Sequence, residues 1–239
     1  MFVAALRMVV QLSLVAIYLE WVFEQNNAWI NSVWVLMMAI VGVLTTIKRT
    51  GLNWRIFVFP FLLAGLTSII LIDTFFLGFI IKLDYAFDAR YFIPITGMIL
   101  GNSLKHNIVG LTSYFRGLKE KVDLYQFLLT NSANIRLALR PFIADALKQA
   151  LNPLIASMSV IGLISLPGMM TGQILGGSSP VTAIKYQIMI MLAVFVGCTI
   201  TLTLSLVISN WFIFDRFNNL KTDVFSKTKS RNKNRNFHK

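Results

Sequence analysis

Long runs of apolar residues, interrupted by few charges, constrain this chain more than any other feature of its sequence. A helix needs about 20 apolar residues to cross the roughly 30 Å hydrocarbon core of a bilayer. Of the 239 residues, 56% are hydrophobic and 13% are charged, about half the charged fraction of a typical soluble domain. We therefore expect an all-α, polytopic membrane helix bundle. Five segments approach or exceed the spanning length: Phe2–Phe23, Ala28–Ile47, Ile56–Ile81, Leu151–Gly177 and Tyr186–Phe214.

The distribution of basic residues predicts how these helices are oriented. A sixth apolar segment, Tyr91–Leu104, is short for a span. If it crosses the membrane, 18 of the 22 Lys and Arg residues fall on one side, in the stretches Lys48–Arg55, Lys105–Lys148 and Arg216–Lys239. Cytoplasmic loops carry such an excess of positive charge. The sequence thus predicts about six spans in the plasma membrane, with the N- and C-termini both in the cytoplasm.

The predicted domains follow from this topology. Residues 1–215 form the transmembrane domain, 105–148 form one cytoplasmic helical loop within it, and 216–239 form a basic, disordered tail. Within the loop, apolar residues recur at helical spacing between charged ones, which predicts an amphipathic helix over Leu118–Ala133. A second helix is expected after Asn134. The apolar stripe needs a covering surface, either this protein's own membrane domain or a separate subunit. For a separate subunit, the hypothetical coupling residues are Leu118, Val122, Tyr125, Leu129 and the neighbouring Ser132.

No arrangement of residues in the sequence predicts catalysis, so an enzyme is not expected. The chain lacks HExxH, GxSxG and paired intramembrane carboxylates, and its single cysteine, Cys198, can form neither an intrachain disulfide nor a thiolate cluster. It also lacks a GxxxxGK[ST] phosphate loop, so it should bind neither ATP nor another cofactor by itself. The net charge of +12 lies between apolar runs and in the tail, which favours the lipid bilayer over nucleic acid as a partner.

Two segments share a glycine motif. Each contains Gly-Met-x-x-Gly followed by an amide residue, and each is preceded by a proline. Glycines four residues apart allow close helix contact, so we expect the segments to pack together beside a translocation path; a purely structural seam is the alternative. Pro167, inside an expected span, should kink or break its helix. The motif residues are Gly97, Met98, Gly101 and Asn102 after Pro94, and Gly168, Met169, Gly172, Gln173 and Gly176 after Pro167.

Asp73 is the only charged residue inside the third expected span. A charge at the centre of a bilayer costs on the order of 2.5–3.5 kcal/mol on insertion scales, so Asp73 should face a partner or water unless it lies at the outer interface. Methionine can contact a soft transition metal, although it also simply fills gaps in apolar packing. The sequence leaves any metal site unknown. The hypothetical translocation path comprises Asp73, Met98, Asn102, Met169 and Gln173.

Four stretches resemble the FetB-type permeases of ABC transporters, a family associated with iron export whose plant members are linked to aluminium tolerance. The resemblance covers most of the chain, and implies a homodimer of permeases bound to two ATP-binding subunits that hold ATP and Mg²⁺. It also implies that the loop 105–148 docks on those subunits. Family members usually carry a further helix before the first stretch, and a glycine where this chain has Asn131-Ser132-Ala133. The stretches are Ala5–Leu14 (ALRMVVQLSL), Pro94–Ser103 (PITGMILGNS), Ser165–Gly177 (SLPGMMTGQILGG) and Ala183–Ile190 (AIKYQIMI).

The leading functional hypothesis is therefore the permease subunit of an ATP-driven ABC transporter, which exports a metal ion such as iron by alternating access. The amphipathic cytoplasmic helix, the missing nucleotide motif and the resemblance all support it. The alternatives are an ABC permease for a different solute, import in place of export, and a membrane scaffold or assembly partner that transports nothing.

Overall fold

The chain folds into helices joined by short connections in the computed structural model, which describes residues 2–80, 85, 87–132, 134–215 and 218–225. Extended pairing within these residues is limited to three isolated β-bridges. In chain order the elements are α1 (Phe2–Gln25), α2 (Ala28–Thr50), α3 (Trp54–Asp73), the π-helix η1 (Thr74–Ile80), α4 (Ala89–Glu120), α5 (Val122–Ser132), α6 (Ile135–Val160), α7 (Gly168–Leu175), α8 (Pro180–Ile213) and the 3₁₀ turn η2 (Thr222–Val224).

The described residues contain four helices long and apolar enough to cross a membrane. The two other expected spans, Tyr91–Leu104 and Leu151–Gly177, are not among them. Tyr91–Leu104 is only the first half of α4, whose 32 residues rise about 48 Å. The stretch 105–148 is helical, as expected, and it comprises the second half of α4, all of α5 and the first half of α6. The six-span count and the cytoplasmic termini stay predictions. The four helices are Phe2–Gln25, Ala28–Thr50, Trp54–Ile80 and Pro180–Ile213.

The expected span Leu151–Gly177 is not one continuous helix. Helix α6 ends at Val160, and after the turn Ile161–Pro167 the short helix α7 packs against α8. Gly162 has φ +86°, which does not occur within a right-handed helix. Pro167, which lacks an amide proton, occupies the position just before α7. The helix is thus interrupted, and a new one starts beside α8.

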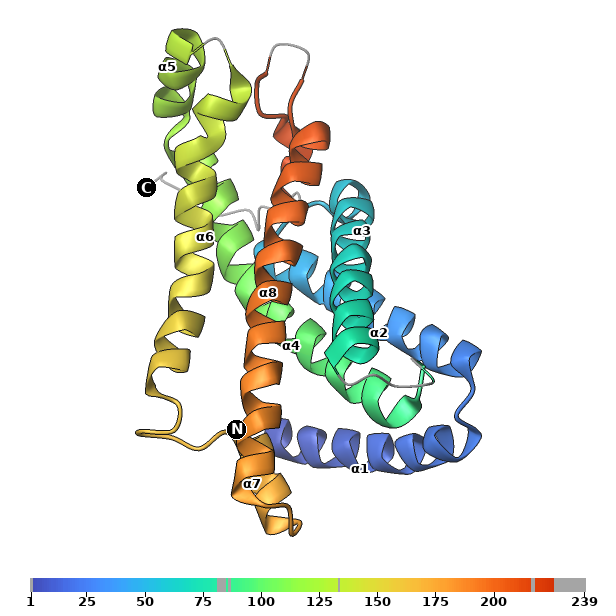
Figure 1. Ribbon diagram of the computed structural model, residues 1–239. Coiled ribbons are helices and arrows are strands. Elements are labelled where there is room, and N and C mark those ends of the chain that lie inside the picture. The colour runs from blue at the N-terminus through green and yellow to red at the C-terminus, as the bar shows by residue number, and fades with distance from the viewer. Residues whose placement is uncertain (1, 81–84, 86, 133, 216–217, 226–239) are drawn as a thin grey trace, which may run out of the picture.

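Two clusters of buried residues fill the bundle, one towards α5 and one towards α7. We call them the α5-end core, which surrounds Phe57 and Tyr114, and the α7-end core, which surrounds Ile72 and Ile99. Figure 1 shows α3, α6 and α8 upright in the view, with α4 passing obliquely behind α8. Helices α2, α3, α4, α6 and α8 contribute to both cores.

Helix α1 is the least buried long helix of the bundle. Val22 is its one buried residue in the described part of the chain. Its end is held by the Tyr18 ring, stacked on Trp34 at 4.1 Å between centroids, and by Asn26 Oδ1, which accepts a hydrogen bond from Ala89 N at 2.9 Å. Figure 1 shows α1 lying across the end of the bundle near α7. Nearly all of its apolar surface is therefore left for lipid or another protein to cover.

Residues 218–225, which the sequence placed in a disordered tail, lie against the bundle. Val224 is fully buried in the α5-end core. Its carbonyl oxygen accepts a hydrogen bond from Asn53 N at 3.0 Å, and the carbonyl of Asp223 accepts one from Asn53 Nδ2 at the same distance. The ammonium of Lys119 lies 4.9 Å from the ring centroid of Phe225. This segment, which we call the strap, ties the turn between α2 and α3 to the end of α4.

Candidate functional site

A cavity of about 320 Å³ brings together the two segments that carry the glycine motif. Met98 of α4 and both Met169 and Gln173 of α7 line it. We call it the methionine cavity. The side chain of Gln173 is half-buried, and its Oε1 has no hydrogen-bond partner among the described residues. The full lining is Phe76, Arg90, Tyr91, Pro94, Ile95, Met98, Met169, Gln173, Tyr186 and Ile190.

Three helix starts place the side chains around the methionine cavity. Asp88 caps α4 by accepting a hydrogen bond from Arg90 N at 3.1 Å, and Ser179 caps α8 by accepting one from Thr182 N at 3.2 Å. Helix α7 starts directly after Pro167, which is favourable before the first helical turn. The local sequence signals at each helix start therefore fix the backbones from which the cavity side chains project.

The chemistry of the methionine cavity is mixed. Thioethers can contact a soft metal ion, whereas an amide oxygen suits a harder one. Arg90 is the one charged residue of its lining, and a guanidinium attracts anions instead. The described residues contain no group of three His, Cys, Asp or Glu side chains that could hold a metal ion. The lining of the cavity thus combines thioethers and an amide with one cationic side chain.

The glycines of the two motifs do not form a seam within this chain. A Cβ atom added at Gly97, Gly101, Gly168 or Gly172 would meet nothing within 4 Å, and one added at Gly176 would meet only atoms of its own turn. The motif faces are uncovered because α7 packs on α8 instead of on the Gly97–Gly101 face of α4.

The close helix approaches occur at two other glycines. A Cβ at Gly110 would lie 2.6 Å from Leu202 Cδ2 and 3.2 Å from Ala150 Cβ. A Cβ at Gly197 would lie 2.9 Å from both Ile72 and Ile99. Each of these glycines stands alone in the sequence without a partner four residues away, so the GxxxG pattern could not identify them.

Asp73 and Asn102 lie outside the methionine cavity. The Asn102 amide donates a hydrogen bond to the carbonyl of Met98 at 2.8 Å, one turn back in its own helix. Asp73 is buried at the end of α3, where it accepts a hydrogen bond from Thr96 Oγ1 at 2.5 Å and lines a different cavity. The structure therefore brings together three of the five predicted path residues and separates the other two.

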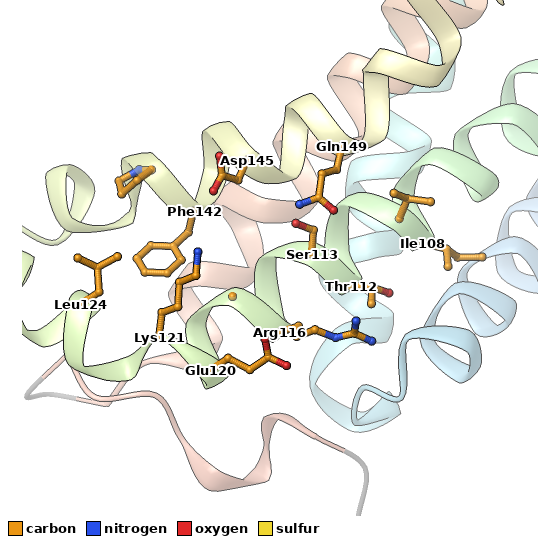
Figure 2. A pocket seen from close by; sticks show the side chains of 13 residues that line it. Ile108, Thr112, Ser113, Arg116, Glu120, Lys121, Leu124, Phe142, Asp145 and Gln149 are labelled. Carbon is orange, nitrogen blue, oxygen red and sulfur yellow. The ribbon is translucent and has the colours of Figure 1, made fainter. Parts of the chain in front are cut away.

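A groove of about 540 Å³ runs between α4 and α6 beside the start of α5. Figure 2 shows Asp145 and Gln149 of α6 lying above Ser113, Arg116 and Lys121 at the α4 end. Within the described residues none of these charged side chains forms an ion pair. We call this surface the α4–α6 groove, and its exposed charges are available to another protein.

The predicted coupling residues divide between the interior and the surface. Leu118 and Tyr125 are buried, with 1% and 2% exposure, in the α5-end core, so neither can contact a separate subunit. Val122 is exposed, Leu129 is partly buried against the same core, and Ser132 donates a hydrogen bond to its own helix at Leu128 O. The apolar stripe is thus mostly covered by this protein's own α6 and strap.

Tyr125 shows how firmly this stripe is held. Its hydroxyl donates a hydrogen bond to the carbonyl of Asn218 at 2.8 Å, and its ring stacks on Phe214. Burial, together with the negative charge of Asp215, raises the pKa of Tyr125 to about 12. The hydroxyl therefore stays protonated at cellular pH and keeps its role as a donor.

Besides Val122, the exposed apolar residues at this end of the protein are ones that the helical spacing did not single out. Phe127 is 64% exposed, Leu137 is 52% exposed and Leu124 is also exposed. One signal in the sequence could have identified them, because α5 has apolar residues on both faces. A surface helix that packs on one face only is usually apolar on that face alone. The candidate partner surface is therefore the group Leu124, Phe127 and Leu137, next to the α4–α6 groove.

The chain is similar over nearly all its length to membrane proteins of several organisms. A family described as "Uncharacterised protein family (UPF0014)" matches residues 1–214. The Arabidopsis thaliana protein ALUMINUM SENSITIVE 3 is 31% identical over 221 residues, which cover 92% of this chain and 79% of that protein. The Escherichia coli "Probable iron export permease protein FetB" is 31% identical over 224 residues, 89% of this chain and 79% of that protein.

A third relative, the Bacillus subtilis "UPF0014 membrane protein YjkA", is 28% identical over 226 residues, 92% of this chain and 87% of that protein. No solved structure matches the chain. The family expected from the sequence motifs is thereby confirmed, and so is a multi-pass protein of the cell membrane.

Proposed function

Since the chain belongs to the UPF0014 family of membrane proteins, we propose that it is the permease subunit of an ATP-driven ABC transporter. One observation carries this proposal. The α5 end of the bundle presents uncovered apolar side chains beside the exposed charges of the α4–α6 groove, although this chain has no phosphate loop of its own. A surface of this kind supports docking of a separate subunit, which would bind ATP and Mg²⁺.

The docking surface is the group Leu124, Phe127 and Leu137 together with the rim of the α4–α6 groove. Aromatic and aliphatic side chains that enter a partner's pocket supply most of the affinity of protein interfaces. The partner's nucleotide-driven closure would push α5. Because Tyr125 ties α5 to the strap and to α6, that push would move the α4 and α6 ends as one unit.

The proposed cargo is a metal ion such as iron, exported by alternating access through the methionine cavity. Two copies of the chain would form the permease. The uncovered glycine faces at Gly97 and Gly101 support this arrangement, because a second copy could approach them closely. Differential contacts of the cargo with the two states of Met98, Met169 and Gln173 would couple transport to ATP hydrolysis.

A second candidate cargo is an anionic solute, including a metal ion in an anionic complex. Arg90 favours it, because a cationic side chain at the cavity wall repels a bare metal ion and attracts a negative charge. Uptake of the bare ion and of its anionic complex into proteoliposomes would separate the two cargoes.

The proposal is tested by purifying the permease from its native membrane and asking whether an ATP-binding subunit accompanies it. We expect co-purification and ATPase activity. Phe127→Glu should abolish both while leaving the thermal stability of the permease unchanged, because this side chain is exposed. Gln126→Glu, which introduces the same charge at a neighbouring exposed position, is the matched control. Isolation of the permease alone, without ATPase stimulation on mixing, would contradict the proposal and favour a scaffold.

A further inference from the structure

A second cavity, of about 340 Å³, lies between α2 and the end of α3 and shares no lining residue with the methionine cavity. Its lining is apolar, for example at Leu36, Ile70 and Phe92, apart from Ser32, Asp73 and Thr74. We call it the Asp73 cavity. Its volume falls within the range of small-molecule sites, which are mostly apolar with a few polar groups.

The carboxyl group of Asp73 is only half satisfied in this cavity. The residue is 5% exposed, and its Oδ2 accepts the hydrogen bond from Thr96 Oγ1. Its Oδ1 has no partner among the described residues. A buried carboxylate surrounded by apolar side chains is unfavourable unless it takes up a proton or a positive charge or further donor comes to it. A ligand that brings a positive charge into this cavity would therefore compete with a proton for the unpartnered oxygen.

The surroundings decide which kind of cation fits. None of the lining residues is Lys, Arg or His, so the positive charge has to come from a ligand. A hydrated divalent metal ion needs several oxygen ligands, whereas this wall offers one carboxylate and two hydroxyls among apolar side chains. A single positive charge on an apolar body matches both the carboxylate and the wall.

The cavity can be reached from the hydrocarbon region of the membrane. Leu36 of α2 and Ile70 of α3 both line it and are 41% and 63% exposed. Both belong to helices long and apolar enough to span the bilayer. A ligand that dissolves in lipid can therefore enter between α2 and α3 without passing through the methionine cavity.

We propose that the Asp73 cavity binds a hydrophobic organic cation with one positive charge. The charge lies beside Asp73 Oδ1, and the apolar body lies against the α2 and α3 walls. This site is separate from the proposed cargo path, so it does not depend on the identity of the cargo or on an ATP-binding partner.

The test uses the purified full chain in lipid nanodiscs with radiolabelled tetraphenylphosphonium as the probe. We expect saturable binding above that of empty nanodiscs, and at least about tenfold weaker binding in Asp73→Asn, since contacts with a charged group are the stronger ones. Asp123→Asn removes a charge from the exposed surface of α5 and should bind like the wild type. Binding that does not saturate, or equal binding in Asp73→Asn, would overturn the proposal.

A second measurement needs no substitution, in case Asp73→Asn does not fold. Dicyclohexylcarbodiimide, a hydrophobic carboxyl reagent, should modify Asp73 in the wild-type protein, as read by peptide mass spectrometry. Saturating tetraphenylphosphonium should prevent this modification and leave that of exposed carboxyls unchanged. Modification of Asp73 at the same rate with and without the cation would show that the cavity does not hold it. Neither readout involves ATPase activity, so failure of this proposal is distinguishable from failure of the proposed function.

Discussion

The two cores of the bundle differ in their content of buried aromatic rings and in the cavities beside them, although the same five helices run through both. In the α5-end core, the ring of Phe57 meets Phe115 edge-on at 5.1 Å, and the Tyr114 hydroxyl donates to Asn210 Oδ1 at 2.6 Å. Buried side-chain oxygens without partners in the described structure occur at both ends, on Ser205 and Ser209 near the α5-end core and on Asn31, Gln187 and Asp73 near the α7-end core. The methionine cavity and the Asp73 cavity both border that second core.

The difference separates a rigid part of the molecule from an adaptable one. Close-packed interiors transmit displacement rather than absorbing it. Cavities such as the two beside the α7-end core leave room for ligands. The α5-end core thus suits the transmission of movement from a docked partner, and the α7-end core suits the binding of solutes.

Removal of an aromatic ring from the α5-end core should have the largest effect. Phe57 is fully buried, so Phe57→Ala should lower the free energy of unfolding by about 3–5 kcal/mol. Phe59 on the same helix is 62% exposed, so Phe59→Ala should change it by about 0.5 kcal/mol or less. Denaturation in mixed micelles measures both. Similar losses in the two variants would show that this core is not closely packed.

Filling the two kinds of glycine position should give the next largest effect. Gly110→Val should destabilise the protein by about 1–3 kcal/mol, because its side chain meets Leu202 and Ala150. Gly101→Val meets nothing within the chain and should leave the melting temperature of the monomer unchanged. If a second copy covers Gly101, the same substitution should weaken the dimer, as measured by mass photometry in nanodiscs. Equal melting temperatures for the two variants would contradict the close approach at Gly110.

The Tyr114 hydrogen bond should make a smaller contribution. Tyr114→Phe leaves Asn210 Oδ1 without its donor and should cost about 0.5–1.5 kcal/mol. Tyr85→Phe changes an exposed phenol and is the matched control. If Tyr85→Phe lowered the free energy of unfolding as much as Tyr114→Phe, the Tyr114–Asn210 hydrogen bond would make no specific contribution to the stability of the α5-end core.

Substitution within the methionine cavity should have the smallest effect on stability and a clear effect on transport. Gln173→Ala should change the free energy of unfolding by about 0.5 kcal/mol or less, since Oε1 has no bond to lose among the described residues. If iron is the cargo, as proposed, this substitution should nevertheless reduce export, measured as a rise in cellular iron. Gln25→Ala at an exposed position of α1 is the control. Unchanged cellular iron in Gln173→Ala would favour the scaffold alternative.

The sequence predicts the membrane class and most helix locations, because several apolar runs of spanning length in one chain are rare outside membrane proteins. It also predicts that Met98, Met169 and Gln173 meet, since both of their segments carry the same motif. It does not reveal that Leu118 and Tyr125 are internal. Spacing identifies an apolar face but cannot say whether the chain itself or a partner covers it.

Long-range contacts account for the other differences between the predictions and the structure. Val224 is buried at a point where its carbonyl accepts a hydrogen bond from Asn53, 171 positions away in the chain. The sequence showed only the basic composition of this segment, which is typical of an unstructured tail. The tight contacts at Gly110 and Gly197 depend on which helices cross there, and a single sequence carries no signal for that crossing.

The most direct test of this account is the labelling of one cysteine at each end of the bundle. Gln126→Cys lies on α5 and Ser178→Cys lies between α7 and α8; both positions are exposed, whereas the native Cys198 is buried. With a membrane-impermeant maleimide on intact cells, we predict labelling of Ser178→Cys only, and labelling of both variants once the cells are permeabilised. Labelling of Gln126→Cys in intact cells would place α5 outside the cytoplasm and contradict its role as the docking surface for an ATP-binding subunit.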